Sequence, residues 1–349
     1  MKKLMKLSDF DYYLPKELIA QSPTEPRDAS RLMVLSDKME HRIFSDIVEY
    51  FENGDTLVLN DSKVIPAKLQ GKKSSGGRIE ALVISRKDAA YECLVRGKNL
   101  HEGSKLYFGE LEATILEVNR NIGTNRYLVD FGRNGDLDSI LEKIGEAPLP
   151  PYIKKKLKDR NRYQTVYSRE KGSIAAPTAG LHFTGDLLDR IKKKGVNIAY
   201  VTLHVGPGTF TPVKSGDIRN HTMEPEYVSI TAENAKIINQ NMGKLIAAGT
   251  TAVKALESSF VEGKISEMYG FSQLFIYPPY EFRSNIDGMI TNFHLPKSTL
   301  LMLVSAFAGK GRLMAAYNEA ISDSYRFYSF GDAMLIFKQG TYVQTYPSR

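Results

Sequence analysis

The chain has 349 residues, of which 42% are hydrophobic and 25% are charged. This balance is typical of a globular protein and excludes intrinsic disorder and collagen-like repeats. Cys93 is the only cysteine, which excludes an internal disulfide and any cysteine-based zinc or iron–sulfur site and favours a reducing, cytoplasmic location. The formal net charge of +7 is too modest to identify a partner without further signals.

No segment is expected to span a membrane. The longest apolar stretch, residues 300–309, is about half as long as a bilayer requires and predicts a buried helix instead. The N-terminal stretch contains lysines but no apolar core, because Asp9 and Asp11 interrupt it. We therefore expect no signal peptide.

A chain of this length predicts two domains of roughly 150 residues each. Residues 56–132 are dense in short β-type runs, which are separated by turn residues such as Gly76-Gly77 and Asn121 to Gly123. Strands at this spacing predict a small antiparallel barrel or sandwich. The proline-rich segment that follows, residues 146–153, is typical of a semi-rigid linker.

From residue 172 onward, helical and strand patterns alternate. Thr184 is a good N-cap for a helix that ends at Gly195, and Ser298 caps a later helix. The predicted strands of this part are residues 196–203, 244–251, 271–279, 287–295 and 328–337. This alternation predicts an α/β domain with a largely parallel sheet.

Ligands of such sheets bind beyond the carboxyl ends of the strands. Three loops are expected there, at residues 204–212, 249–251 and 291–299. A fourth segment, residues 174–185, leads into a helix N-terminus, whose free N–H groups attract anions or carbonyl oxygens. We expect these segments to line one shared cleft. Four of the six histidines lie at or near them: His182, His204, His221 and His294.

The glycine pair of HVGPGTF, residues 204–210, has two interpretations. A Gly-x-Gly after a strand lets a nucleotide approach the backbone closely, as in dinucleotide-binding proteins and methyltransferases. The third glycine of that fingerprint is missing and Pro207 removes an N–H donor, so a tight turn is the stronger interpretation of the motif alone. Neither a GxxxxGK[ST] P-loop nor a Gly-x-Ser-x-Gly elbow occurs, which excludes those two enzyme classes.

The histidines lack the spacing of a metal site, because neither HExxH nor His-x-His occurs. Their position in ligand-facing loops suits acid–base chemistry, since imidazole changes charge near neutral pH. A single histidine is nevertheless more often structural than catalytic. Glu257 has two interpretations: an inert exposed carboxylate on a helix, or a group at the mouth of the sheet that binds hydroxyls or an amine.

Basic residues are densest at 153–171, where Tyr163 and Tyr167 are interleaved with eight lysines and arginines. Cations beside aromatic rings are typical of proteins that bind single-stranded or loop RNA. A solvated helix face is an equally strong alternative. For the aromatic and basic cluster at residues 325–328 we expect core packing.

Several long strings of the sequence, taken together, resemble one known family. They are FDYYLPKELIAQSPTEPRDASRLMVL, NDSKVIPAKL, PLPPYI, RYQTVYS, AAPTAGLHFT, LHVGPGTF, TNFHLPKSTLLMLVSAFAG and YRFYSFGDAMLIF. In this order, over about residues 7 to 337, they resemble the S-adenosylmethionine:tRNA ribosyltransferase-isomerases of queuosine biosynthesis.

The resemblance implies an α/β fold, with a twisted, open, largely parallel sheet and a deep trough, into whose sequence a small six-stranded antiparallel β-barrel is inserted. It implies a discontinuous catalytic domain, residues 1–62 and 151–349, and an inserted barrel with its linker at residues 63–150. The strand pattern alone does not indicate that residues 1–62 belong to the α/β domain.

The implied reaction transfers and isomerises the ribosyl group of S-adenosylmethionine onto 7-aminomethyl-7-deazaguanine at the wobble position of tRNA. The product is epoxyqueuosine, and adenine and methionine leave. S-adenosylmethionine is then a co-substrate, and no prosthetic group or metal is implied. The expected partners are S-adenosylmethionine and the anticodon loop of tRNA, and we expect a cytoplasmic monomer.

A sulfonium acidifies the neighbouring ribose 5′ carbon, so a neutral imidazole can remove a proton there, while N–H donors stabilise the departing adenine in a dry trough. The candidate catalytic residues are His182, His204 and His294. The candidate substrate-binding residues are Thr178, Gly180, Phe183, Gly206, Gly208, Thr209, Lys254, Glu257, Asn292 and Ser298. The candidate tRNA-binding residues are Lys154, Lys155, Lys156, Arg162 and Tyr163.

Two places depart from the family pattern. Lys254 stands where an arginine is usual, which replaces a bidentate contact by a single-point one. Glu224 and Pro225 stand where His-Ser is usual. Two alternatives stay open: an S-adenosylmethionine-dependent methyltransferase, against which the incomplete glycine pattern argues, and a tRNA-binding module without catalysis.

Overall fold

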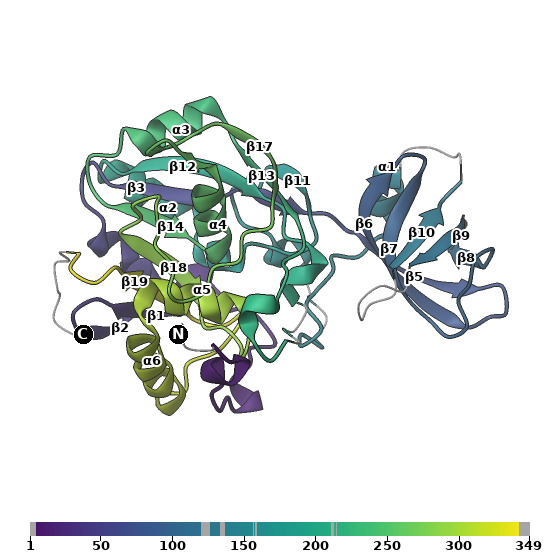
Figure 1. Cartoon of the computed structure of the whole chain (residues 1–349), viewed down its shortest axis with the longest axis horizontal. Coiled ribbons are helices and arrows are strands. Elements are labelled where there is room, and N and C mark those ends of the chain that lie inside the picture. Colours follow the sequence, from purple (N-terminus) through teal and green to yellow (C-terminus); the bar gives the residue numbers. More distant parts are fainter. Residues whose placement is uncertain are drawn as a thin grey trace. The chain divides into compact units, whose positions relative to one another are not determined.

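The computed structural model describes residues 5–119, 126–132, 137–155, 157, 159–210, 213 and 215–341. Its contacts divide the chain into two compact units, Met1–Lys63 with Pro150–Arg349, and Val64–Leu149. The first unit contains a nine-stranded sheet and the second a closed six-stranded barrel (Figure 1). The expected fold class, an α/β sheet with an inserted barrel, is confirmed.

The large sheet is parallel at its centre and antiparallel at its edges. Its strands lie in the order β17 (Met268–Ser272), β13 (Glu226–Ile230), β12 (Asn197–Leu203), β3 (Thr56–Asn60), β14 (Leu245–Ala248), β18 (Gly288–Asn292), β19 (Ala333–Phe337), β1 (Arg31–Leu35) and β2 (Met39–Ile43). Strands β12, β3, β14 and β18 are mutually parallel. Strand β3 comes from the strand-dense part of the sequence, yet it lies at the centre of this sheet, as the family resemblance implies.

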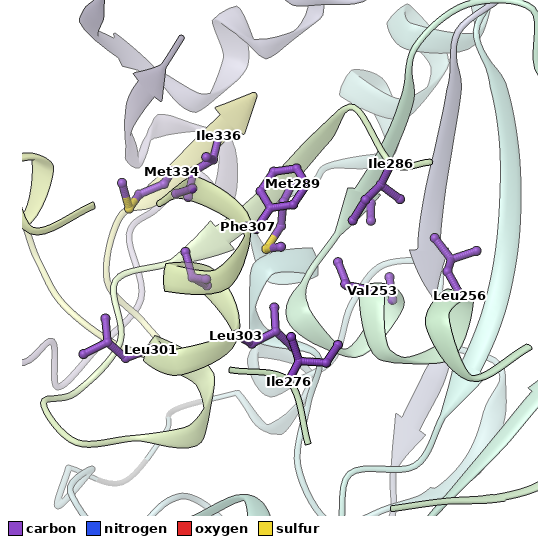
Figure 2. Close-up of a cluster of buried hydrophobic side chains, with 14 of the residues drawn as sticks. Val253, Leu256, Ile276, Ile286, Met289, Leu301, Leu303, Phe307, Met334 and Ile336 are labelled. Carbon is purple, nitrogen blue, oxygen red and sulfur yellow. The ribbon is translucent and has the colours of Figure 1, made fainter. Parts of the chain in front are cut away.

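Helices cover both faces of the sheet. They are α2 (Gly185–Lys193), α3 (Ala232–Asn239), α4 (Thr250–Ser259), α5 (Thr299–Ala308) and α6 (Lys310–Ser322). Alternate side chains of a strand point to opposite faces, so Val58 of β3 packs with α3 to α6, whereas Leu57 packs with α2 and the 3-10 helix Phe44–Tyr50. Figure 2 shows the first of these layers, where side chains of α4, α5, β18 and β19 converge.

Two helix starts follow the predicted capping. Thr184 Oγ1 accepts a hydrogen bond from Leu187 N at 3.1 Å, and Gly195 takes a left-handed φ of +87° just beyond α2. Ser298 Oγ accepts from Leu301 N at 3.2 Å, and the apolar helix α5 that follows is buried, as expected.

Four predicted strands are wrong in part. Those at residues 244–251 and 287–295 run beyond the ends of β14 and β18, and residues 250–251 already belong to α4. Of residues 271–279, only 271–272 belong to a strand, since Leu274 N donates to Ser272 Oγ and Pro278-Pro279 offer no N–H to a ladder. Of residues 328–337, only β19 is extended, since the preceding residues form a turn in which Gly331 N donates to Tyr328 O.

The barrel is antiparallel throughout its described pairs, as predicted. Its strands follow the closed order β10 (Arg126–Asp130), β7 (Ala90–Arg96), β6 (Arg78–Lys87), β5 (Lys68–Lys73), β8 (Lys105–Phe108) and β9 (Leu111–Asn119). Apolar side chains fill its interior, including the fully buried Cys93 and residues of helix α1 (Leu137–Ile144). The single cysteine is therefore a core residue.

Four short strands form two further sheets: β4 (Ser62–Val64) with β11 (Glu170–Ser173), and β15 (Phe260–Val261) with β16 (Lys264–Ile265). Within the described ranges, no single helix is long and apolar enough to cross a bilayer. Helices α5 and α6 together have the length and composition, but the chain bends by 114° between them.

Candidate active site

The loops at the carboxyl ends of β12, β14 and β18 meet at one pocket of about 550 Å³. Its lining includes Thr178, Ala179, Val205, Thr209, Gly249, Thr291, Asn292 and His294. Gly249 turns the chain from β14 into α4 with a left-handed φ of +99°, and its N–H donates to Ile290 O at 2.7 Å. The predicted convergence of these distant segments on one cleft is confirmed.

His182 does not line this pocket but is hydrogen-bonded to Asn292, which does. Its Nδ1 is 2.7 Å from Ser30 Oγ and its Nε2 is 3.0 Å from Asn292 Nδ2. An amide nitrogen only donates, so Nε2 is the acceptor, and Nδ1 carries the proton and donates to Ser30. Asn292 Oδ1 accepts in turn from Thr178 Oγ1 at 3.0 Å. The four side chains form one chain of hydrogen bonds that ends at the pocket.

Burial, helped by the charge of Arg162 and other arginines, lowers the pKa of His182 to about 3. The imidazole is therefore neutral at pH 7, and both of its nitrogens are engaged. These features fit a residue that orients Asn292 and, through it, Thr178. They do not fit a group that exchanges protons with a substrate.

His294 is the one predicted histidine of the three that lines the pocket. Its Nε2 is 2.8 Å from Thr291 Oγ1, and Nδ1 has no hydrogen-bond partner among the described residues. Its backbone is fixed on both sides, since its N–H donates to Tyr317 Oη at 2.9 Å and its carbonyl accepts from Tyr12 Oη. Burial lowers the pKa of His294 to about 3, so the imidazole of this lining residue is neutral at pH 7.

His204 faces a different hollow. Its Nδ1 is 2.7 Å from Ser62 Oγ, and its ring stacks on that of Tyr227 with the centroids 5.5 Å apart. Burial lowers its pKa, and the nearby Asp61 carboxylate raises it by a smaller amount. The three candidate histidines thus occupy three different environments. Among the described residues, no group of three or more His, Cys, Asp and Glu side chains could hold a metal ion.

Lys254 and Glu226 form a buried ion pair beside the pocket, with side chains only 6% and 4% exposed. Glu226 Oε1 also accepts from Thr209 Oγ1 at 2.8 Å and from Gly206 N at 3.3 Å. The pair therefore fixes the loop that follows β12. The ion pair also borders a second, mostly apolar hollow of about 350 Å³. This hollow shares Thr209 and three other lining residues with the pocket of His294.

Three predicted binding residues are needed for close packing. A Cβ at Gly180 would lie 2.1 Å from Tyr167 Oη. A Cβ at Gly208 would lie 2.9 Å from the carboxyl carbon of Glu224. Phe183 is fully buried among core side chains. None of the three is among the residues that line the two hollows, so the structure supports a packing role for them.

Glu257 and Ser298 are occupied within the fold. The Glu257 carboxylate is fully buried and accepts from Ser284 N at 2.9 Å and Tyr280 Oη at 2.9 Å. Both interpretations made from the sequence, an exposed inert carboxylate and a group in the mouth of the sheet, are therefore wrong. Ser298 Oγ donates to Leu295 O at 2.7 Å in addition to capping α5, so its hydroxyl positions the helix.

The basic segment differs in part from the prediction. Lys154 and Lys155 are exposed, as tRNA contacts require, and Lys156 lies outside the described residues. Tyr163 is fully buried and packs against Phe330 with the centroids 5.8 Å apart, so the prediction that its ring stacks on RNA is wrong. Arg162 is nine-tenths buried, and its Nε donates to a carboxylate oxygen of Glu25 at 2.5 Å.

A solvated helix face, the alternative for this segment, is also wrong for the part of it that the structure describes. There the only helical residues are one 3-10 turn, Arg160–Tyr163. The exposed lysines before that turn remain the candidates for contacts with phosphate groups.

Three residues important to the site were not found from the sequence. Ser30 accepts the Nδ1 proton of His182, and Glu226 organises the loop after β12. Tyr328 lines the pocket with a left-handed φ of +74°, a conformation that costs a non-glycine residue about 1–3 kcal/mol and clusters at functional sites. Tyr328 belongs to the aromatic and basic cluster for which the sequence predicted core packing, and Glu226 is a carboxylate within an otherwise strand-like run.

A pocket at the carboxyl ends of parallel strands, lined by hydroxyl, amide and imidazole groups, is typical of the active site of an α/β enzyme. The model of the family described as Queuosine biosynthesis protein matches residues 7–336. The chain belongs to this family.

Two relatives support the assignment. The chain is 52% identical over 344 residues to a protein named S-adenosylmethionine:tRNA ribosyltransferase-isomerase from Pelotomaculum thermopropionicum, which covers 95% of this chain and 100% of the relative. It is 42% identical to the crystal structure of an S-adenosylmethionine tRNA ribosyltransferase from Thermotoga maritima, with a TM-score of 0.55 over 95% of this chain and 100% of that one. The protein is thus an enzyme of queuosine biosynthesis.

Proposed function

We propose that the enzyme transfers and isomerises the ribosyl moiety of S-adenosylmethionine onto 7-aminomethyl-7-deazaguanine at the wobble position of tRNA. Epoxyqueuosine is formed, and adenine and methionine are released. The observation that carries the proposal is the pocket at the carboxyl ends of the parallel strands, whose lining includes His294 together with Thr178 and Asn292, which are hydrogen-bonded to each other.

The shape and lining of the two adjoining hollows suit S-adenosylmethionine. Thr178, Asn292 and Thr209 offer hydroxyl and amide groups to a ribose in the first hollow. The second is lined by apolar side chains such as Leu274 and Leu303, which suit the methylene groups of the methionyl part. The co-substrate would then extend from one hollow into the other, past the hydroxyl of Thr209.

His294 is our candidate for the group that starts the reaction. Its Nδ1 would accept a proton from the ribose 5′ carbon, leaving the electron pair on carbon as a sulfonium ylide. The low pKa of the histidine makes it a weak base but keeps the imidazole neutral at pH 7. Nδ1 is its acceptor nitrogen in the tautomer whose Nε2–H donates to Thr291 Oγ1. Departure of adenine is then favoured by N–H donors in a site that excludes water.

The tRNA is proposed to present its anticodon loop to the same unit of the chain. Unpaired loop bases are accessible without opening a duplex. Lys154 and Lys155, both exposed, are proposed to contact backbone phosphates, whereas the buried Arg162 would hold the segment that carries them.

The test is release of adenine. Purified protein is incubated with S-adenosylmethionine and tRNA that carries 7-aminomethyl-7-deazaguanine, and the spent co-substrate is separated by chromatography. We expect adenine and methionine in amounts equal to the modified tRNA, and none with unmodified tRNA. S-adenosylhomocysteine as the product would instead identify a methyltransferase, and tRNA binding without any product would identify a module without catalysis. Either result would overturn the proposal.

A further inference from the structure

Arginines converge on a small hollow beside the pocket of His294. The hollow, of about 220 Å³, is lined by Pro23, Thr24, Arg27, Ser30, Arg162, Leu181, His182, Ser329, Phe330 and Gly331. We call it the arginine hollow. Its described lining carries two guanidiniums and no carboxylate. Besides burial, three positive charges lower the pKa of His182, those of Arg162, Arg326 and Arg27. Three guanidiniums therefore lie close to one imidazole at this place.

The guanidinium of Arg162 has one nitrogen that no other group of the fold engages. The residue is nine-tenths buried, its Nε donates to a carboxylate oxygen of Glu25 at 2.5 Å, and its Nη2 donates to Thr24 O at 2.6 Å. Nη1 is buried as well, yet it has no hydrogen-bond partner among the described residues. A buried N–H donor without an acceptor is costly, so an anionic ligand that accepts from it would bind favourably.

Arg27 adds a second guanidinium, which backbone atoms hold in place. Its Nη1 donates to Leu181 O at 3.2 Å, and its Nη2 donates to Asn161 O at 3.1 Å. Burial, and then the charge of Arg162, lower the pKa of Arg27, and nearby carboxylates such as that of Glu25 offset this only in part. Because both guanidiniums are already fixed, an anion can bind here without ordering flexible side chains.

The arginine hollow adjoins the pocket of His294. Ser329 lines both of them, and Asn292 of the pocket donates a hydrogen bond to His182 of the hollow at 3.0 Å. The arginine hollow shares no lining residue with the apolar hollow in which the methionyl part of S-adenosylmethionine is proposed to lie. The proposed orientation of the co-substrate therefore leaves the arginines to the other substrate.

The basic segment is tied to the part of the chain that lines the arginine hollow. Gln21 Oε1 accepts a hydrogen bond from Lys154 N at 3.0 Å, and Gln21 Nε2 donates to Tyr152 O at 3.0 Å. Two residues after Gln21, Pro23 lines the hollow, as does Arg162 further along the basic segment. Positive charge thus continues from the exposed Lys154 to the arginines, which is the pattern that a phosphate backbone requires.

We propose that the arginine hollow binds a backbone phosphate of the tRNA, at or next to the target nucleotide, through the guanidiniums of Arg27 and Arg162. The planar fork of a guanidinium matches the oxygens of a phosphate group. The phosphate does not react, so it can be held beside the pocket while the target base reaches the ribosyl group inside it. Phosphate contacts position a nucleic acid. The proposal rests on the proposed function and adds the site that positions the second substrate.

The test is a double-mutant cycle between Arg27 and the phosphates of the RNA. The probe is an anticodon stem-loop that carries 7-aminomethyl-7-deazaguanine at the wobble position, together with copies in which one loop phosphate is replaced by a neutral methylphosphonate. Fluorescence anisotropy measures binding to the full-length protein. We expect Arg27→Gln to weaken binding of the natural backbone about tenfold, and one methylphosphonate at or next to the wobble nucleotide to weaken wild-type binding by a similar factor. The two losses should not add, because they remove the same contact.

A second variant separates the charge of Arg27 from its fork. Arg27→Gln should lower the slope of log affinity against log salt concentration by about one. Arg27→Lys should keep the slope but lose part of the affinity, since an ammonium group makes a single-point contact. Both variants should bind S-adenosylmethionine within threefold of the wild-type affinity, which also shows that they are folded.

Arg190→Gln is the matched control, because Arg190 is exposed and is absent from the lining of the arginine hollow. The substitution removes the same charge. Any effect that it has on RNA binding should add to the effect of every methylphosphonate, including the one that is coupled to Arg27.

Failure of this proposal is distinguishable from failure of the proposed function. If the wild type releases adenine but the losses from Arg27→Gln and from every methylphosphonate add, the hollow binds no loop phosphate and this proposal is wrong. Weaker binding of S-adenosylmethionine to Arg27→Gln, with RNA binding unchanged, would assign the hollow to the carboxylate of the co-substrate and also contradicts it. Losses that do not add, with S-adenosylmethionine binding retained, support it, whatever product the enzyme forms.

Discussion

Asn292 Nδ2 lies 3.0 Å from His182 Nε2, and this contact fixes His182 as an acceptor toward the pocket wall. The relationship separates two histidines that look equivalent in the sequence. His182 acts through Asn292, whereas His294 itself lines the pocket. Substitution of His182 should therefore act through the position of Asn292, whereas substitution of His294 should act on the pocket directly.

Replacing His182 by leucine should remove one partner of the Asn292 amide and leave it held only by Thr178 Oγ1 and a long contact to Asp332 O, so that its position shifts. Because a misplacement of about 1 Å can cost about 100-fold in rate, we expect kcat/KM for S-adenosylmethionine to fall by roughly that factor. His182→Gln should restore part of it, since its amide oxygen can accept from Asn292 Nδ2. Steady-state adenine release measures both variants. Equal losses in the two would contradict the positioning role.

Replacing His294 by alanine removes the proposed proton acceptor. General-base catalysis contributes typically about 10²–10⁴-fold, so we expect a fall in kcat of that order with the affinity for S-adenosylmethionine changed less than threefold. His101→Ala is the control, because His101 is exposed in the barrel. A His294→Ala variant with a normal kcat and a raised KM would assign the residue to binding alone.

Stability should depend on pH through the two buried histidines. Burial lowers the pKa of His182 and of His294 from 6.5 to about 3, so between these values the unfolded chain binds protons that the folded chain does not. The free energy of unfolding therefore falls as the pH drops below 6.5, by about 1.4 kcal/mol per pH unit for each histidine. At pH 5 this amounts to about 2 kcal/mol each. Urea unfolding from pH 7.5 to pH 5 measures the slope, which should be shallower in His182→Gln/His294→Gln. Equal slopes in the wild type and the double variant would show that neither histidine causes the pH dependence of stability.

The buried pair of Lys254 and Glu226 gives a prediction on stability. Lys254→Met leaves the Glu226 carboxylate buried without its partner, which should lower the free energy of unfolding by about 3–5 kcal/mol. The double variant Lys254→Met/Glu226→Gln should lose much less, because no uncompensated charge remains. Thermal or urea unfolding compares them. A double variant as unstable as the single one would mean that packing, and not charge, dominates at this place.

Charge reversal at Lys154 and Lys155 tests the proposed tRNA contacts. Each phosphate contact contributes roughly one unit to the dependence of log affinity on log salt concentration. We expect Lys154→Glu/Lys155→Glu to bind tRNA more weakly and with a slope reduced by about two. Lys98→Glu/Lys72→Glu, in the barrel, reports whether the effect is specific to the basic segment. An unchanged slope in the first variant would remove these lysines from the interface.

Short-range sequence signals predicted much of the α/β fold. The caps at Thr184 and Ser298 and the buried helix over residues 300–309 follow from short-range chemistry, which a sequence displays directly. The convergence of loops at the strand ends follows from the geometry of parallel sheets. By contrast, the central position of β3 depends on pairing with β12 and β14, far away in the chain, and only the family resemblance indicated it.

The roles of individual side chains were harder to predict. An interleaved tyrosine such as Tyr163 looks the same in sequence whether its ring faces RNA or Phe330. Glu257 was placed at the surface or the cleft, because its partners Tyr280 and Ser284 are more than twenty residues away. Which histidine faces the pocket was equally undetermined, since orientation depends on tertiary contacts such as that of His182 with Ser30.

The central claim is that the pocket between the ends of β12, β14 and β18 binds S-adenosylmethionine with its reacting carbon beside His294. A crystal structure of the complex with S-adenosylmethionine tests this most directly. The account predicts the ribose in contact with Thr178 and Asn292, and His294 Nδ1 as the imidazole nitrogen nearest to the 5′ carbon. Finding the ribose in the separate hollow lined by His204 and Tyr227, or the 5′ carbon closer to any other histidine, would contradict it.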